Sequence, residues 1–110
     1  MSSAEHMERR TYAAENVITV ACELVQLEKS QLCAVERKTP RWATMGREAV
    51  AGATYELASI SYPELASMLG HHAHGGVMAQ VQKFNRQWPR HIRRSWLEAV
   101  LVRLDHEVRS

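Results

Sequence analysis

The sequence predicts an all-α protein, a six-helix bundle that contains a helix-turn-helix. Residues that favour helices, chiefly Ala, Leu, Glu, Arg, Gln and Met, are abundant, and no strand-like alternation of apolar and polar residues stands out. Apolar residues instead recur three and four positions apart along most of the chain. The chain has 110 residues, 45% of them hydrophobic and 24% charged, which suits one globular domain with one core. We therefore expect residues 1–110 to form a single helical domain.

Capping residues and proline divide the first half of the chain into three expected helices. Apolar spacing predicts a first helix from about Met7 to Leu27. Ser30 is a suitable cap for a short second helix over Gln31–Glu36. A third helix begins at Pro40 or at Thr44, and the sequence leaves both starting points open.

The second half carries the clearest helix signals. Ser61 and Glu64 have the spacing of a capping box, so we expect a fourth helix to start there and to end at Gly70. A fifth helix from about His74 to Trp88 completes a helix-turn-helix over residues 61–88. Pro89 then starts an extra C-terminal helix that covers residues 89–109.

Two sets of residues are expected to fill the core of this bundle. The buried stripe of the last helix is predicted to hold Ile92, Trp96, Val100, Leu104 and Val108. Three methionines are predicted to fill gaps in the core, namely Met45, Met68 and Met78.

The charges come in blocks, although the formal net charge is only +2. Residues 37–47 include basic side chains and no acidic one, and no acidic residue occurs from Leu65 to Leu97. Two basic blocks separated by acidic ones indicate a face for a polyanion, and solubility charge that happens to cluster is the alternative. We expect the two blocks to form one surface made of Arg37, Lys38, Arg41, Arg47, Lys83 and Arg86.

Catalysis and membrane insertion find little support. The sequence has no Gly-x-x-x-x-Gly-Lys-Ser/Thr phosphate loop, so we expect no nucleotide cofactor, and nothing indicates another cofactor. Asp105 is the single aspartate and no carboxylate pair accompanies a histidine, so we do not expect an enzyme. No apolar run suits a membrane span or a signal peptide, and Cys22 and Cys33 indicate no disulfide framework, so we expect a cytoplasmic location without a membrane partner.

Three features have two interpretations each. His71, His72 and His74 could ligate a metal, but their spacing fits no familiar zinc pattern, and a polar turn with His74 facing DNA is favoured. Trp42 could stack on unpaired bases or anchor helix packing, whereas Trp96 lies in an apolar stripe and is expected to anchor packing. A second DNA contact and a solvated helix face are both open for Arg90, His91, Arg93 and Arg94.

The stretch Glu56–Leu65, followed by Gly70, His74 and Val77, resembles the signature of the C-terminal DNA-binding domain of the bacterial chromosomal replication initiator DnaA. That domain has a Glu-Leu pair, a Ser-x-Pro-Glu-Ile helix start and a Gly-Gly-Arg-Asp-His-Thr-Thr-Val segment that opens its recognition helix. The likeness covers roughly Asn16 to Trp88. It implies an all-α, Trp-repressor-like fold that binds double-stranded DNA in the major groove. On this basis the chain is similar to a divergent, stand-alone relative of that domain.

The resemblance also implies roles for individual residues. Arg47 matches a family arginine that reaches the minor groove. Ser61 matches the start of the first motif helix, where we expect it to be mainly structural and also able to donate to a phosphate. His74 matches the recognition-helix histidine, and Lys83 matches a basic residue late in that helix. With the helix N-terminal amides, phosphate contacts are expected from Arg37, Lys38, Arg41, Lys83 and Arg86.

The sequence departs from the family at the residues that read DNA. His72 replaces an arginine, Ala73 replaces an aspartate, and Gly75 and Gly76 replace two threonines. Histidine cannot reproduce the bidentate arginine–guanine contact, which is worth about 1–3 kcal/mol of discrimination. We therefore expect weakened or altered specificity. Gly75 and Gly76 would let the backbone approach phosphates, and the base contacts would come from His72, His74, Met78 and Gln82.

The resulting expectation is a double-stranded DNA-binding protein that works in replication initiation or its regulation. The alternative is a protein-interaction module that keeps the fold and has lost the specific DNA contacts. The substitutions at Ala73, Gly75 and Gly76 favour the alternative, and the acid-free stretch from Leu65 to Leu97 favours DNA binding. The sequence leaves the oligomeric state open.

Overall fold

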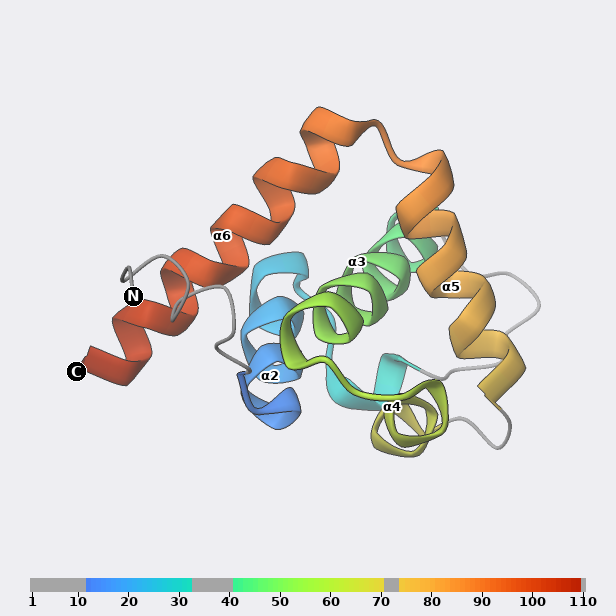
Figure 1. The fold of residues 1–110 in the computed structure, drawn as a ribbon, viewed down its shortest axis with the longest axis horizontal. Coiled ribbons are helices and arrows are strands. Elements are labelled where there is room, and N and C mark those ends of the chain that lie inside the picture. The colour runs from blue at the N-terminus through green and yellow to red at the C-terminus, as the bar shows by residue number, and fades with distance from the viewer. Residues whose placement is uncertain (1–11, 33–40, 71–73, 110) are drawn as a thin grey trace, which may run out of the picture.

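The computed structural model describes residues 12–32, 41–70 and 74–109, and it is helical throughout these ranges apart from short connections (Figure 1). The all-α prediction is thereby confirmed. The described residues form five α-helices and one short 3-10 helix: α2 (Ala14–Val25), η1 (Lys29–Gln31), α3 (Arg41–Ala58), α4 (Tyr62–Leu69), α5 (His74–Gln87) and α6 (Arg90–Arg109).

The first half of the chain differs from the expectation at three helix ends. α2 begins at Ala14, because Ala13 has extended backbone angles. Tyr12 and Ala13 were predicted to be helical, and this is wrong, while the predicted start near Met7 lies outside the described residues. Ser30 lies inside η1, and Glu28 is its N-cap, with its N–H donating to the Gln31 side chain over 2.8 Å. Thr44 lies within α3 and does not cap it, while the competing start at Pro40 lies outside the described residues.

α3 is the central element, and it packs against α2, α4, α5 and α6. Most of its small residues are buried, including Ala49, Ala51 and Ala53, which lets the neighbouring helices approach from several sides. Its Val50 and Ala51 belong to a cluster shared with α2, α4 and α5. Ala53 and Ala58 belong to a second cluster shared with α2 and α6. The core is therefore arranged around α3.

α3 and α5 pack in close contact at Gly52. A Cβ atom at Gly52 would overlap the Phe84 ring, far inside van der Waals contact. Phe84 is itself fully buried, and its ring lies 4.9 Å from that of Trp88. The indole N–H of Trp88 donates to Oε1 of Glu48, one turn from Gly52 on α3, over 3.1 Å. These contacts fix which face of α5 points inward.

α6 crosses the bundle above α2 and α3 and meets α5 at a sharp corner (Figure 1). Trp96 packs against both core clusters, and its indole N–H donates to the carbonyl of Ala49 over 2.9 Å, so its predicted packing role is confirmed. Nearer the C-terminal end, Tyr12 donates to Asp105 over 3.0 Å, and Arg103 pairs with Glu23 over 3.0 Å. The predicted extra helix thus packs across the bundle and contacts both core clusters.

Three residues predicted in the core lie at the surface. Ile92 and Met45 are each 45% exposed, and Met68 is also exposed, whereas Met78 is partly buried as expected. Ile92 shares the stripe of Val100 and Leu104 in sequence, but it lies in the first turn of α6 and is exposed, whereas Val100 and Leu104 farther along the helix are buried. The side chain of Val108, the last residue of the predicted stripe, is not described.

The described part of the chain contains no helix that is both long and apolar enough to cross a membrane.

The contact at Gly52 makes a matched pair of glycine substitutions informative. Gly52→Ala should lower the free energy of unfolding by about 1–3 kcal/mol or more, because the methyl group overlaps the Phe84 ring. Gly75→Ala is the control, since a Cβ there would meet nothing within 4 Å and alanine favours a helix. Urea denaturation of both variants measures the difference. Equal stability of the two would contradict the packing described at Gly52.

Candidate nucleic-acid interface

The helices of the predicted helix-turn-helix lie where the sequence places them. Ser61 is the N-cap of α4, and its Oγ accepts the N–H of Glu64 over 3.4 Å. Gly70 ends α4 in the left-handed conformation, with φ of 84°, which glycine adopts without strain. α5 follows from His74, while residues 71–73 of the turn lie outside the described residues. Leu65 and Leu69 of α4 pack with Val77 and Val81 of α5 in one cluster.

The burial pattern of α5 leaves one face of the helix open to solvent. Val77, Val81 and Phe84 are fully buried against α3 and α4. The opposite face carries Gly75, Ala79, Gln82, Lys83 and Arg86, all of them exposed. Ala79 is small, and a shallow hollow is lined by Ala79, Gln82, Lys83, Arg86 and Gln87. This outward face holds two positive charges and no acidic residue.

Arg41, at the N-terminal end of α3, lies close to the C-terminal end of α5. Gln87 lines the hollow that contains Lys83 and Arg86, and it also lines a second hollow together with Arg41. Because one side chain borders both hollows, basic residues of the two predicted blocks flank the same end of α5. That these three basic residues form one DNA-binding surface stays a prediction.

Arg47 points to another part of the molecule. Its Nε donates to the carbonyl of Gln31 in η1 over 2.7 Å, and the side chain is partly buried. This contact ties the first part of α3 to η1. The structure therefore does not bring Arg47 together with Lys83 and Arg86, and its contact with a minor groove stays a prediction.

Several predicted site residues are only partly covered by the structure. Arg37, Lys38 and His72 lie outside the described residues, and the side chain of His74 is not described either. Met78 is partly buried and Gln82 is exposed, one turn apart on α5. Gly76 is exposed beside Gly75 at the start of the helix.

A tyrosine pair connects α3 to α4 within electrostatic range of this face. The rings of Tyr55 and Tyr62 stack with centroids 4.5 Å apart and an interplanar angle of 11°. A hydrogen bond with the Tyr55 side chain, aided by burial, raises the pKa of Tyr62, while the charge of Arg86 acts in the opposite direction. The sequence did not predict this pair, because the two tyrosines belong to different helices and share no regular spacing.

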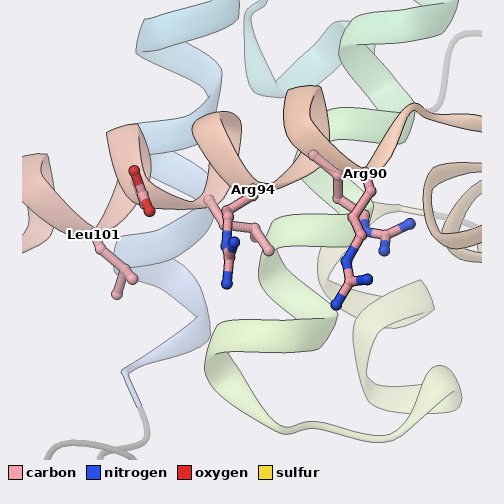
Figure 2. Close-up of a pocket in the computed structure, with 6 residues that line it drawn as sticks. Arg90, Arg94 and Leu101 are labelled. Carbon is pink, nitrogen blue, oxygen red and sulfur yellow. The ribbon is translucent and has the colours of Figure 1, made fainter.

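The N-terminal half of α6 carries a further group of arginines. Figure 2 shows a hollow along this helix, lined by Arg90, Arg93, Arg94, Leu97, Glu98 and Leu101. The guanidinium of Arg93 donates to the backbone carbonyl of Asn85 near the end of α5, so Arg93 helps to hold the corner between the two helices. Arg90 and Arg94 are exposed one turn apart. Glu98 gives this hollow a mixed charge, unlike the outward face of α5.

Metal binding finds no site among the residues that the structure describes, since no three His, Cys, Asp or Glu side chains gather there. His71 and His72 fall outside that part. Cys22 is buried in the core, and this burial raises the pKa of its thiol. Its surroundings fit a small packing residue.

No protein-family model matches the chain, and no curated protein matches it either.

The cap of α4 offers a test of the motif's local structure. Ser61→Ala should lower the free energy of unfolding by about 0.5–2 kcal/mol, because the N–H of Glu64 loses its acceptor. Ser67→Ala is the matched control, since Ser67 is an exposed residue inside the same helix. Thermal and urea denaturation measure both variants. An equal loss of stability in the two variants would show that the cap at Ser61 does not contribute to the free energy of unfolding.

Proposed function

We propose that this chain binds double-stranded DNA through the outward face of α5, in replication initiation or its regulation. The observation that carries the proposal is the exposed, acid-free face of α5 with Lys83 and Arg86, flanked by Arg41 from α3. An α-helix that projects from a compact body fits the width of a major groove. Lysine and arginine neutralise phosphates, which supplies most of the sequence-independent affinity of such proteins.

The order of the elements supports a relationship with the initiator's DNA-binding domain. A capped helix of eight residues ends at a glycine, and the following helix packs back on it and on a long preceding helix. These are the parts that the resemblance implies, in the same order. We propose on this basis that the chain is a divergent member of that group.

The start of α5 supports weak base readout. Gly75 and Gly76 stand where the related domain carries threonines, and neither glycine offers a side chain to a base. Open space around Gly75 leaves room for the backbone to approach a phosphate. Gln82 is exposed on the outward face, whereas Met78 is partly buried. Binding should therefore show little preference among sequences compared with the ratios of about 10³–10⁷ of dedicated regulators.

One observation favours the competing function, a protein-interaction module. An apolar hollow opens at the corner between α5 and α6, lined in part by the exposed Met45 and Ile92. Gln87 borders both surfaces, and Arg41 lines the hollow and also flanks the outward face of α5. The two functions are separable at Lys83 and Arg86 on one side and at Met45 and Ile92 on the other. Variants of each surface can therefore test each function alone.

Salt dependence tests the binding of phosphates. Replacing Lys83 and Arg86 together with alanine should weaken binding to all duplexes alike and should lower the slope of log K against log salt by about 0.9 for each phosphate that is no longer neutralised. Titration of fluorescent random duplex at several salt concentrations measures the slope. Arg103→Ala is the control, because Arg103 pairs with Glu23 away from α5. An unchanged slope in the folded double variant would remove α5 from the DNA-binding surface.

Gly75→Ala tests the close approach of the backbone. The substitution should leave the protein as stable as before or more stable by up to about 1 kcal/mol, while the added methyl group weakens DNA binding without regard to sequence. The same duplex titration and a melting curve measure the two effects. Full DNA affinity in this variant would place the phosphates farther from the start of α5.

A further inference from the structure

An apolar hollow lies at the corner where α5, α6 and the N-terminal part of α3 meet. Its apolar lining consists of Met45, Trp88, Pro89 and Ile92, and its volume is about 540 Å³. Met45 and Ile92 are among the few large hydrophobic side chains that the described structure leaves exposed. Trp42 is 58% exposed, and it lies three positions before Met45 on α3, which extends the apolar surface along one side of that helix. The hollow has room for more than one side chain.

Internal contacts hold the hollow in shape. The floor residue Trp88 donates to Glu48 and packs against Phe84, and Arg93 donates to the carbonyl of Asn85 across the corner. Such contacts reduce the conformational entropy that a binding surface loses when a partner binds. The hollow is therefore a preformed feature of the folded chain.

The charge at the hollow selects the kind of partner. Glu48 is only 9% exposed and its Oε1 accepts the indole N–H of Trp88, so its carboxylate is turned inward. Arg41 is exposed at the rim. A fitting partner therefore carries an exposed apolar side chain with acidic neighbours.

The C-terminal half of α6 carries such a side chain. Val102 is 70% exposed, more than any other large hydrophobic residue that the described structure leaves at the surface. Glu98, which is exposed, lies four positions before it, so this carboxylate lies beside Val102 on the helix, whereas Asp105, three positions after it, accepts the hydroxyl of Tyr12. The same chain thus presents an exposed valine beside an acidic residue, and an apolar hollow with a basic residue at its rim.

We propose that the protein associates head to tail, with Val102 of one copy entering the hollow of the next and Glu98 approaching Arg41. Ile92 and Val102 are ten positions apart, so they lie about 15 Å apart along α6 and about 80° apart around it. Because they face different directions, one copy can engage two neighbours, which gives head-to-tail chains of copies, open or closed into rings. The contact is small, so the association is weak and reversible. This inference does not depend on DNA binding and is tested without DNA.

Paired variants test the protrusion and the hollow separately. Sedimentation of the wild-type chain at increasing concentrations, up to about millimolar, should show a mass that rises without stopping at a dimer. Val102→Glu and Ile92→Glu should each weaken association by about tenfold or more. An equimolar mixture of the two should form one-to-one dimers and nothing larger, because the intact Val102 of one variant fits the intact hollow of the other. Met68→Glu, a change of another exposed apolar residue on α4, should associate like the wild type.

Several results would overturn the proposal. A wild-type chain that remains monomeric at every concentration would assign the hollow to a different partner. A mass that stops at a dimer would replace the head-to-tail chain with a two-fold contact. Failure of the mixed variants to pair would show that Val102 and the hollow do not meet. None of these results bears on DNA binding, which is measured by the titrations of Lys83 and Arg86.

Discussion

The contact of the Phe84 ring with Gly52 is the constraint on which the rest of the structure depends. It brings α5 against α3 so closely that no side chain fits between them, and it fixes the rotation of α5 about its own axis. One turn farther, Trp88 reaches Glu48 and sets the position of the corner. The outward direction of Lys83 and Arg86 and the existence of the hollow both follow from this packing. A small residue in the middle of α3 therefore controls two surfaces that it does not touch.

α6 stabilises this arrangement by packing against α2 and α3. Its middle is anchored through Trp96, and its later part is tied to the first described residues by Tyr12 with Asp105 and by Arg103 with Glu23. Exposed ion pairs contribute little stability individually, so the partly buried Trp96 and the buried Val100 and Leu104 account for most of the attachment. The start of α6 is less enclosed, and Ile92, Arg90 and Arg94 are exposed there, whereas Arg93 is held by the carbonyl of Asn85.

The candidate site was only partly predictable, and the reasons are physical. Lys83 and Arg86 were identified from an acid-free stretch, and their exposure follows from the spacing of Val77, Val81 and Phe84. Arg47 belonged to a basic block in sequence, yet it turns to the carbonyl of Gln31 because it points from α3 toward η1. Met45 and Ile92 were expected in the core, since apolar residues at helical spacing usually are. No spacing rule states which part of a helix its neighbours cover, and both residues line the open hollow at the corner between α5 and α6.

The sequence by itself determined the helical class, the start of α4 at Ser61, its end at Gly70 and the inward stripe of α5. These features depend on interactions within a few residues, such as a cap, a left-handed glycine and a repeat of three and four positions. The tertiary structure alone decided that Glu48 would be buried against Trp88, that Arg47 would hold η1, and that an apolar corner would remain open beside the basic face. Each of these depends on how helices far apart in the chain pack against α3, and local sequence patterns do not determine that packing.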